Sequence, residues 1–444
     1  MAMSNTFSVV EQPKRKFERI GILFAGGPAP AANAVISAAA TAFKRHGTEA
    51  IGIKHGYSQL MNFDPNKPLE LGRDYVILDQ AAVKRTRNSR GIMIGTSRAN
   101  PGKYISSPEH LLEMEFAQPL RRVYEGLRSL GVEALISIGG DDTLKTANKL
   151  KMFQDHLPAD SARIPVVHLP KTIDNDYFGI DFTFGFFTAV EFLAEELRNL
   201  IHDSEASGAY FLAETMGRSA GWLAYGAAIA GEPSLVISVE DIAGPYLDEE
   251  EYTDPQSGET KVRAIMNVDA LVGHIVQTML ARESHGKQYG VVVVAEGIAE
   301  YLPMKYLEGI SRDEHGHISI TEVRLDRLMS QLVADAYEKE TKRKKKVNGL
   351  QLGYEARCGR PHAFDVMLGS QLGVGAYRAL AEQGLNGVMV SVAGQLELHY
   401  EPFEKLVDSK TLVTKVRYID RQSDFHRLAR FLETNVNEFL PGNN

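Results

Sequence analysis

One stretch decides the fold class: residues 134–150 read ALISIGGDDTLKTANKL and predict a strand, a glycine turn and a helix in succession. The first five residues form a continuous apolar run, which is typical of a strand buried in a sheet. Residues 165–176 begin in the same way, because the strand-like PVVHL precedes PKTIDND. Both polar segments therefore follow the carboxyl ends of strands, where open α/β sheets bind their ligands.

The same alternation extends outward from this stretch in both directions. Residues 19–36 read RIGILFAGGPAPAANAVI, which predicts a buried strand, a Gly/Pro turn and an alanine-rich helix. Further strand-like runs occupy residues 50–53, 209–213, 235–239, 290–295 and 387–392. Apolar strands separated by helical stretches are typical of parallel sheets covered on both faces. We therefore predict an α/β protein with two Rossmann-like, three-layer domains, mainly parallel sheets and an active site in the cleft between the domains.

Length and composition set the broad class of protein. The chain has 444 residues, of which 44% are hydrophobic, which is enough for two or three domain cores. Its one cysteine, Cys358, excludes an internal disulfide, and its net charge of −8 disfavours a nucleic-acid partner. No apolar run of about 18 residues is present, and residues 1–18 lack the apolar core of a signal peptide. We expect a cytoplasmic protein without membrane association, with residues 1–18 as a frayed tail.

Four carboxylates and one lysine follow the two central strands. In the segment 139–143, GGDDT, the carboxylate of Asp141 is placed to hold Mg²⁺, which binds one or two carboxylates together with phosphate oxygens. The plainer interpretation is a helix cap. In the segment 170–176, Asp174 can take a proton from a sugar hydroxyl as a general base, whereas the plainer interpretation is an Asx-rich turn. Two such segments at successive strand ends favour metal-assisted phosphoryl transfer.

Taken in order, the motifs of this chain resemble the 6-phosphofructokinase family. The matching segments are GGPAP at 26–30, GGDDT at 139–143, PKTIDND at 170–176, FTFGFFTA at 182–189, MGR at 216–218, GWLA at 221–224, AEG at 295–297 and GYEARCG at 353–359. The resemblance covers most of the chain, and eight motifs in one order are far more specific than any one of them. NAD and lipid kinases resemble the chain at Gly139–Asp141 alone.

The resemblance implies a phosphofructokinase-like fold and a role for each motif residue. Asp174 is the catalytic base that deprotonates O1 of fructose 6-phosphate, and Asp141 binds the expected cofactor, Mg²⁺. The phosphoryl donor is bound by Gly26, Gly27, Arg98, Gly140 and Lys171. The sugar phosphate is bound by Thr172, Ile173, Asp174, Met216, Gly217, Arg218, Glu296, Tyr354 and Arg357. Guanidinium groups suit phosphate and carboxylates suit hydroxyls, so the residue types agree with these roles.

Two of these positions, Asp142 and Lys171, discriminate between phosphoryl donors. ATP-using members of the family generally have glycine at both, which leaves room for the α-phosphate. Asp142 fills that space, and two unit charges about 4 Å apart repel by roughly 4 kcal/mol at an effective dielectric constant of about 20. Lys171 would offset the charge on the leaving phosphate in the transition state. The combination resembles pyrophosphate-dependent members and makes both residues catalytic candidates; the plainer alternative is that the two side chains pair with each other.

The resemblance also assigns domains. Residues 19–186 with about 358–410 form the donor-binding domain, residues 187–357 with about 411–444 form the sugar-phosphate-binding domain, and a surface insertion occupies about 241–265. The chain departs from the family pattern at Ala31, where glycine is usual. It also has Ala209 and Asn348 where short bacterial members place arginines that reach a neighbouring subunit. We expect a homodimer or homotetramer and assign no effector site and no role to the basic run 342–346.

We therefore predict a reversible, Mg²⁺-dependent phosphorylation of fructose 6-phosphate at O1 by pyrophosphate, giving fructose 1,6-bisphosphate in glycolysis or gluconeogenesis. The partners would be these two substrates and further copies of the chain. Three alternatives stay open: ATP as the donor, sedoheptulose 7-phosphate as the acceptor, and a non-catalytic regulatory subunit. A regulatory subunit would be expected to have lost Asp141, Lys171 or Asp174, and the chain has all three.

Overall fold

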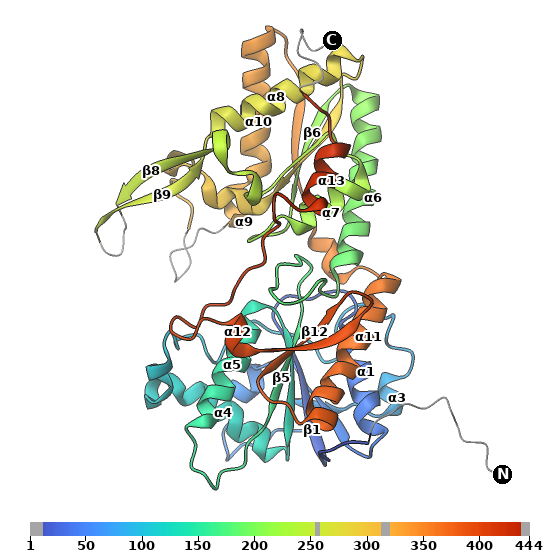
Figure 1. Ribbon diagram of the computed structural model, residues 1–444, viewed down its shortest axis with the longest axis vertical. Helices are drawn as coiled ribbons and strands as arrows, with labels where there is room; N and C mark the ends of the chain where they lie inside the picture. Colours follow the sequence, from blue (N-terminus) through green and yellow to red (C-terminus); the bar gives the residue numbers. More distant parts are fainter. Residues whose placement is uncertain (1–11, 254–257, 312–319, 437–444) are drawn as a thin grey trace, which may run out of the picture. The chain divides into compact units, whose positions relative to one another are not determined.

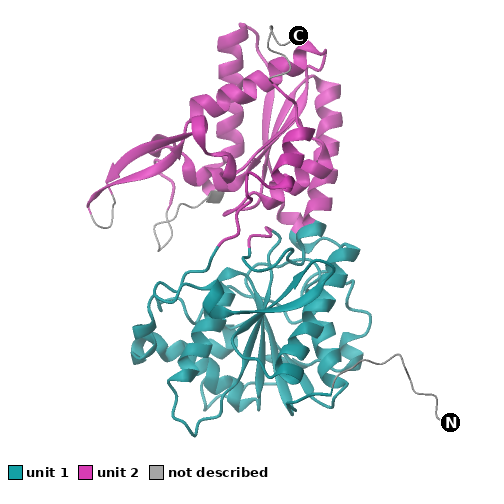
Figure 2. Ribbon diagram, viewed as in Figure 1, with its two compact units in different colours: residues 1–173, 177–188, 357–415 teal, residues 174–176, 189–356, 416–444 magenta. Residues whose placement is uncertain are grey.

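The computed structural model describes residues 12–253, 258–311 and 320–436. The chain divides into two compact units (Figure 2). Unit 1 comprises residues 1–173, 177–188 and 357–415, and unit 2 comprises residues 174–176, 189–356 and 416–444. The sequence predicted domain boundaries near residues 186, 357 and 410. In the structure the chain passes from one unit to the other after residues 188, 356 and 415.

Unit 1 is built on a seven-stranded sheet ordered β13-β12-β5-β4-β1-β2-β3 (Figure 1). Its strands are β1 (Arg19–Ala25), β2 (Glu49–Ile53), β3 (Tyr75–Ile77), β4 (Ala134–Gly139), β5 (Val166–Pro170), β12 (Val388–Ala393) and β13 (Glu397–Pro402). The edge strands β3 and β13 are antiparallel to their neighbours, and the other pairs are parallel. Ala25 is paired with Gly139, and Gly139 with Pro170, so three strands end side by side.

Helices flank this sheet. They are α1 (Ala32–Lys44), α2 (Ser58–Met61), α3 (Gln80–Val83), η1 (Pro108–Leu111), α4 (Met114–Ser129), α5 (Asp141–Asp155), α11 (Ala363–Tyr377), the π-helix η7 (Arg378–Gln383) and α12 (Phe403–Leu406). α1 and α11 pack closely because α11 has glycine at the contact. A Cβ atom at Gly373 would lie 2.4 Å from the carbonyl oxygen of Val35, which is shorter than any van der Waals contact.

Unit 2 contains a four-stranded parallel sheet ordered β11-β6-β10-β7. Its strands are β6 (Tyr210–Thr215), β7 (Leu235–Ile237), β10 (Gly290–Ala295) and β11 (Val347–Leu352), and β8 (Leu247–Thr253) and β9 (Thr260–Met266) form a separate antiparallel pair. The helices are α7 (Trp222–Gly231), η2 (Val239–Asp241), η3 (Gly244–Tyr246), α8 (Val268–Ser284), η4 (Glu296–Tyr301), η5 (Met304–Tyr306), α9 (Ile320–Val323), α10 (Leu325–Thr341) and α13 (Asp424–Leu432). α6 (Phe186–Ser207) and η6 (Tyr354–Cys358) contain residues of both units.

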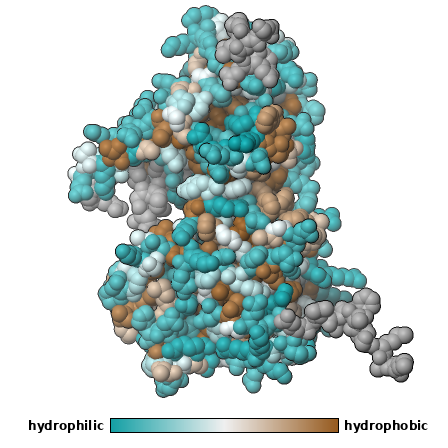
Figure 3. All heavy atoms as spheres, viewed as in Figure 1, coloured by the Kyte–Doolittle hydropathy of each residue, from teal (hydrophilic) through white to brown (hydrophobic). Residues whose placement is uncertain are grey.

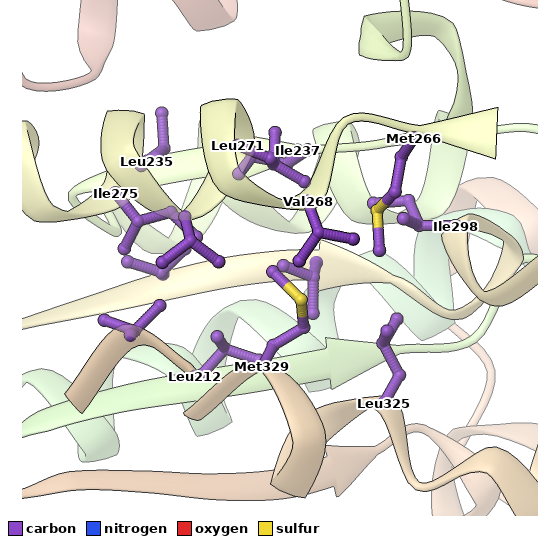
Figure 4. Packing of buried hydrophobic residues seen from close by; sticks show 14 of the residues in the cluster. Leu212, Leu235, Ile237, Met266, Val268, Leu271, Ile275, Ile298, Leu325 and Met329 are labelled. Atoms are coloured by element: carbon purple, nitrogen blue, oxygen red, sulfur yellow. The ribbon is translucent and has the colours of Figure 1, made fainter. Parts of the chain in front are cut away.

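The core of unit 2 lies where the sheet is covered by α8 and α10. Leu212 and Ile237 from the strands pack with Leu271 and Ile275 from α8 and Met329 from α10 (Figure 4). All five side chains are almost completely buried. The strands are continuous apolar runs, as expected where both faces of a sheet are covered. The predicted α/β class with mainly parallel sheets is confirmed.

The frayed tail expected at residues 1–18 does not extend to residues 12–18, and residues 1–11 lie outside the described residues. Residues 12–18 are attached to unit 1: the Arg15 amide donates to the Ala381 carbonyl at 3.0 Å, and Phe17 is buried. Within the insertion expected at about 241–265, most described residues of the hairpin β8–β9 are exposed, whereas Asp241 at its start accepts hydrogen bonds from the Tyr225 hydroxyl at 2.8 and 2.9 Å. The turn-forming residues of this insertion predict reversals of the backbone, but they do not indicate which residues the side chains contact. The hairpin β8–β9 accounts for the rest of the segment.

Hydrophilic side chains predominate on the face of the molecule drawn in Figure 3, and hydrophobic ones form small groups among them. In the parts of the chain that the structure describes, no helix combines the length and the hydropathy needed to span a bilayer.

Candidate active site

A small cavity lies in unit 1 beside the ends of β1 and β4, and its volume is about 290 Å³. Every residue that the sequence assigned to the donor and the metal lines it: Gly26, Gly27, Arg98, Gly140, Asp141 and Lys171, together with Asp142. The parallel register explains the convergence, because the strands that precede these turns end level with one another. We call this space the donor cavity.

Lys171 places a positive charge against the two glycine turns. Its Nζ atom lies 3.7 Å from the position that a Cβ atom would take at Gly26 and 3.7 Å from the same position at Gly140. Gly26 has a φ of +88°, which disfavours any residue with a side chain. The Lys171 side chain is buried. The glycines thus let a buried ammonium group lie close to backbone N–H groups. Both the ammonium group and the N–H groups attract a phosphate.

Asp141 and Asp142 begin α5, with Gly140 as the N-cap residue. The Nζ atom of Lys145 lies 2.8 Å from Oδ2 of Asp141 and 2.9 Å from Oδ1 of Asp142. Residues three and four positions apart lie on one face of a helix, which brings the three side chains together. Burial lowers the pKa of Lys145, but the two carboxylates outweigh burial and the net shift is upward. Asp142 therefore has a partner on its own helix.

The remaining oxygen of Asp141 has a partner from a distant part of the chain. The Thr414 hydroxyl, from the segment after α12, donates a hydrogen bond to Oδ1 of Asp141. Both oxygens of this carboxylate are therefore engaged, while its side chain is 53% exposed. No motif marks Thr414, so reasoning from the sequence missed it.

Hydrogen bonds hold one wall of the donor cavity against α5. Thr146 donates to Oδ1 of Asn100 at 2.9 Å, and Nζ of Lys149 donates to the Gly102 carbonyl at 2.9 Å. Burial, helped by the nearby charge of Lys145, lowers the pKa of Lys149 to about 8. Asn100 and Gly102 belong to the same segment as Arg98, so these bonds to α5 help to fix the position of the Arg98 backbone.

A neutral histidine supports the GGDDT turn from behind. Nε2 of His168 lies 3.1 Å from the Tyr177 hydroxyl, which donates to the Gly139 carbonyl at 3.0 Å. Burial lowers the pKa of His168 to about 3. His168 is therefore uncharged at neutral pH and has a structural role in the core.

In unit 2 the predicted sugar motifs converge at the ends of β6, β10 and β11. The Gly217 amide donates to Oε1 of Glu296 at 3.1 Å. A Cβ atom at Gly297 would lie 2.2 Å from the Arg218 carbonyl oxygen, and one at Gly353 would lie 2.8 Å from Cγ of Met216. Glycine at 297 and 353 is therefore required for the three segments to approach each other. This group of residues is called the MGR–AEG cluster below.

The polar side chains of the MGR–AEG cluster are accessible. Nη2 of Arg218 forms an ion pair with Oε1 of Glu300 at 3.0 Å, and the two side chains are 46% and 36% exposed. Tyr354 is 58% exposed. An ion pair this open to water contributes little to stability, so Arg218 can exchange Glu300 for a phosphate at small cost.

The chain matches a family model described as Phosphofructokinase over residues 19–380. The chain belongs to the phosphofructokinase family. A pyrophosphate–fructose 6-phosphate 1-phosphotransferase of Thermotoga maritima is 33% identical over 93% of this chain and 90% of the relative. An ATP-dependent 6-phosphofructokinase of Chloroflexus aurantiacus is 29% identical over 86% of this chain and 88% of the relative. The solved structure of a pyrophosphate-dependent phosphofructokinase of Nitrosospira multiformis matches 94% of this chain and 92% of its own chain, with a TM-score of 0.64. The sequence identity is 17%, so this match shows a shared fold.

The remaining predicted residues of this phosphofructokinase-family chain fall in both units. Thr172 and Ile173 end a segment of unit 1, and the Ile173 side chain is buried, so its backbone is what it can offer a ligand. Asp174 belongs to the three-residue segment 174–176 of unit 2. Arg357 lies in unit 1, where its Cζ atom is 4.0 Å from the position of a Cβ atom at Gly27.

Three features outside the assigned site residues have a structural explanation: Ala31, the basic run 342–346 and His362. Ala31 adopts a φ of +65° at the start of α1, so it keeps the left-handed conformation that glycine would take more readily. Within the basic run, Lys345 pairs with Oε1 of Glu283 at 3.0 Å and Arg343 pairs with Oε2 of Glu283 at 2.8 Å. These two cations of the run are thus attached to α8. His362 caps α11 by accepting a hydrogen bond from the Phe364 amide at 3.1 Å.

Proposed function

We propose that this chain is a diphosphate–fructose-6-phosphate 1-phosphotransferase, which transfers phosphate reversibly from pyrophosphate to O1 of fructose 6-phosphate. The observation that carries the proposal is the charge arrangement of the donor cavity. Asp142 projects from the first turn of α5 and is bound by Lys145, while Lys171 is buried against the glycine turns. The names of relatives include both donors, so the support for pyrophosphate comes from these residues and not from the family.

The size and charge of the donor cavity favour the smaller donor. A cavity of about 290 Å³ lies just under the range of about 300–1,000 Å³ typical of sites for drug-sized ligands. Pyrophosphate is smaller than these ligands and has no nucleoside, so its affinity must come from charge. Lys171 supplies a cation at the turns, and Asp142 places a negative charge where a further phosphate would lie. A nucleoside triphosphate would bring its further phosphate into this repulsion.

The residues present fit a Mg²⁺ ion bound together with its substrate. Within the described residues, no three His, Cys, Asp or Glu side chains cluster as a metal site made of protein alone. Mg²⁺ commonly binds through one or two carboxylates plus substrate phosphates, and Asp141 beside the donor cavity offers such a carboxylate. When bound, the ion would neutralise charge on the phosphate oxygens. Lys145 and Thr414 each contact one Asp141 oxygen, and each oxygen has a second lone pair that the ion could use.

The proposed reaction needs a base, a nucleophile and a stabilised leaving group. O1 of fructose 6-phosphate attacks one phosphorus of pyrophosphate, and the bond from that phosphorus to the bridging oxygen breaks. The O1 proton passes to the carboxylate of Asp174, and orthophosphate leaves with the electron pair of the broken bond. Lys171 stabilises the charge on this leaving group. Arg218 and Glu296 bind the phosphate and hydroxyls of the sugar.

The test measures turnover with each donor. The purified protein with Mg²⁺ and fructose 6-phosphate should turn over pyrophosphate, and ATP should give less than about one tenth of that kcat/KM. Replacing both discriminating residues with glycine (D142G/K171G) should abolish the reaction with pyrophosphate and raise the relative activity with ATP. Robust activity with ATP and none with pyrophosphate in the unaltered protein would contradict the donor assignment. Preference for sedoheptulose 7-phosphate would change the acceptor and leave the donor assignment intact.

A further inference from the structure

A late segment of unit 2 contacts the backbone beside Asp174. The Arg417 amide donates to the Asp176 carbonyl at 2.9 Å, and Nη2 of Arg417 donates to the Asn175 carbonyl at 2.9 Å. Arg417 is 242 positions away from Asn175 in the sequence, and both belong to unit 2. The fold thus places one arginine against two successive carbonyls that follow Asp174. We call residues 174–176 the base segment.

The backbone of the base segment has an unusual conformation. Asn175 has a φ of +56°, in the left-handed region that residues other than glycine adopt uncommonly. Asn175 is also completely buried. Such conformations persist where the surrounding structure fixes them, and they cluster at active sites. Because the peptide groups after Asp174 set the path of this turn, the bonds from Arg417 also restrict the direction of the Asp174 side chain.

The one tryptophan of the chain, Trp222, holds Arg417 in place. Cζ of Arg417 lies 4.3 Å from the centroid of the Trp222 ring. A guanidinium group over the face of an indole ring is attracted by the ring electrons. Nε1 of Trp222 also donates to the Arg417 carbonyl at 2.8 Å. Trp222 therefore fixes both the side chain and the main chain of Arg417.

The support of the base segment continues into α7 and α13. Oε1 of Glu240 accepts hydrogen bonds from the Gly221 amide at 3.1 Å and from the Ile419 amide at 3.0 Å. The ring of Phe425 in α13 lies 5.2 Å from that of Trp222, and α13 packs against α7 (Figure 1). The residues at 221 and 222 begin the GWLA motif, which follows MGR in the chain. The base segment and the MGR–AEG cluster thus share one supporting structure.

We propose, on the basis of the proposed function in which Asp174 is the base, that Arg417 is a positioning residue. It holds the carbonyls of Asn175 and Asp176 and thereby keeps the Asp174 carboxylate directed at the hydroxyl that it deprotonates. Arg417 contacts no reacting atom in this proposal. Misplacing a reacting group by about 1 Å can lower a rate about 10²-fold. Loss of the guanidinium group should therefore lower kcat and leave the KM values nearly unchanged.

The first experiment needs no catalysis and measures hydrogen–deuterium exchange in the full chain. Arg417→Met removes the guanidinium group and should make exchange in a peptide containing the base segment at least about fivefold faster. The control Arg421→Met removes an exposed arginine four positions further along and should exchange as the unaltered protein does. The fluorescence of Trp222 should change in Arg417→Met and not in the control, because the guanidinium group lies over the Trp222 ring.

The second experiment is steady-state kinetics with pyrophosphate. Arg417→Met should lower kcat at least about tenfold, with both KM values within about twofold of the unaltered protein. Arg417→Lys keeps a cation that can reach one carbonyl and should recover part of the activity. This variant also serves if the methionine variant does not fold. The double variant D174N/R417M should be no slower than D174N alone, because a base that is absent cannot be misplaced.

The outcomes separate the positioning role from the proposed function. Unchanged exchange of the base segment in Arg417→Met and Arg417→Lys overturns the proposal, and so does faster exchange with an unchanged kcat. Additive losses in the double variant, or an equal loss in Arg421→Met, overturn it as well. If D174N keeps full activity, the assignment of Asp174 as the base fails, and the exchange experiment alone then decides whether Arg417 holds the base segment.

Discussion

The donor cavity of unit 1 and the MGR–AEG cluster of unit 2 lie at comparable places in their sheets but are held together in different ways. Both follow the carboxyl ends of parallel strands. The donor cavity is organised by charged side chains, with Lys145 joining Asp141 and Asp142. The MGR–AEG cluster is organised by backbone contacts, with Gly297 directly against the Arg218 carbonyl. The difference teaches that the charges of the donor cavity can change by one side chain, whereas the MGR–AEG cluster depends on the path of the backbone.

The largest effect is expected from a substitution in the segment 174–176. This segment belongs to unit 2 and comes soon after Lys171 of the donor cavity in the chain. Asp174→Asn should lower kcat by about 10³-fold, within the range of about 10²–10⁴ for loss of a general base. The KM values for both substrates should change little, because the amide keeps the shape of the side chain. Steady-state kinetics with pyrophosphate checks this. Asp160→Asn, an exposed carboxylate in a loop, is the control, and an equal loss in that variant would remove Asp174 from the mechanism.

The next effect compares glycines that differ in their surroundings. Gly373→Ala should destabilise the protein by about 2–3 kcal/mol, because the new methyl group meets the Val35 carbonyl at 2.4 Å between α1 and α11. Gly273→Ala, in α8 of unit 2, has no atom within 4 Å of its Cβ position and should stabilise the protein by about 0.5–1 kcal/mol. Denaturant unfolding of both variants measures the two signs. Equal effects would mean that α1 and α11 can separate freely.

A smaller effect tests the charge arrangement of the donor cavity. Lys145→Met should raise the KM for pyrophosphate about tenfold, equivalent to about 1.4 kcal/mol, because Asp141 and Asp142 then repel the donor without a compensating cation. The KM for fructose 6-phosphate should stay the same, since the MGR–AEG cluster makes no use of Lys145. Lys151→Met removes a lysine of α5 that pairs with Asp155 and Glu404 instead, and serves as the control. A KM change in both variants would point to a general effect on α5.

The smallest effect is a pH dependence of opposite sign in the two units. Burial lowers the pKa of Lys149 in unit 1 to about 8, so between pH 8 and 10.5 the unfolded state binds more protons and stability rises with pH. Burial raises the pKa of Glu433 in unit 2 to about 7, so between pH 4.5 and 7 the folded state binds more protons and stability falls as pH rises. Each slope should reach at most about 1.4 kcal/mol per pH unit.

Lys149→Met should remove the slope above pH 8, and Glu433→Gln should remove the slope below pH 7. Urea unfolding across both pH ranges measures each slope separately. A slope that persists in either variant would assign the titration to another group.

Much of the donor cavity could be predicted because its residues follow strands whose apolar runs are visible in the sequence. The segments at 26–27, 139–142 and 171 were expected together, and the structure places them around one cavity. The partner of Asp142 was not foreseen, although Lys145 stands at a helical spacing of three residues that could have suggested it. Thr414 carries no local signal. Its contact with Asp141 depends on where the segment after α12 returns to the sheet.

The sequence by itself determined the alternation of strands and helices, the family and the residue types that line the donor cavity. These follow from local patterns, because apolar runs and glycine turns act within a few positions of the chain. The tertiary structure alone decided which charges meet. It paired Lys145 with both aspartates and brought Thr414 to Asp141. The physical reason is that electrostatic contacts depend on distance in space, which strand order and helix packing set.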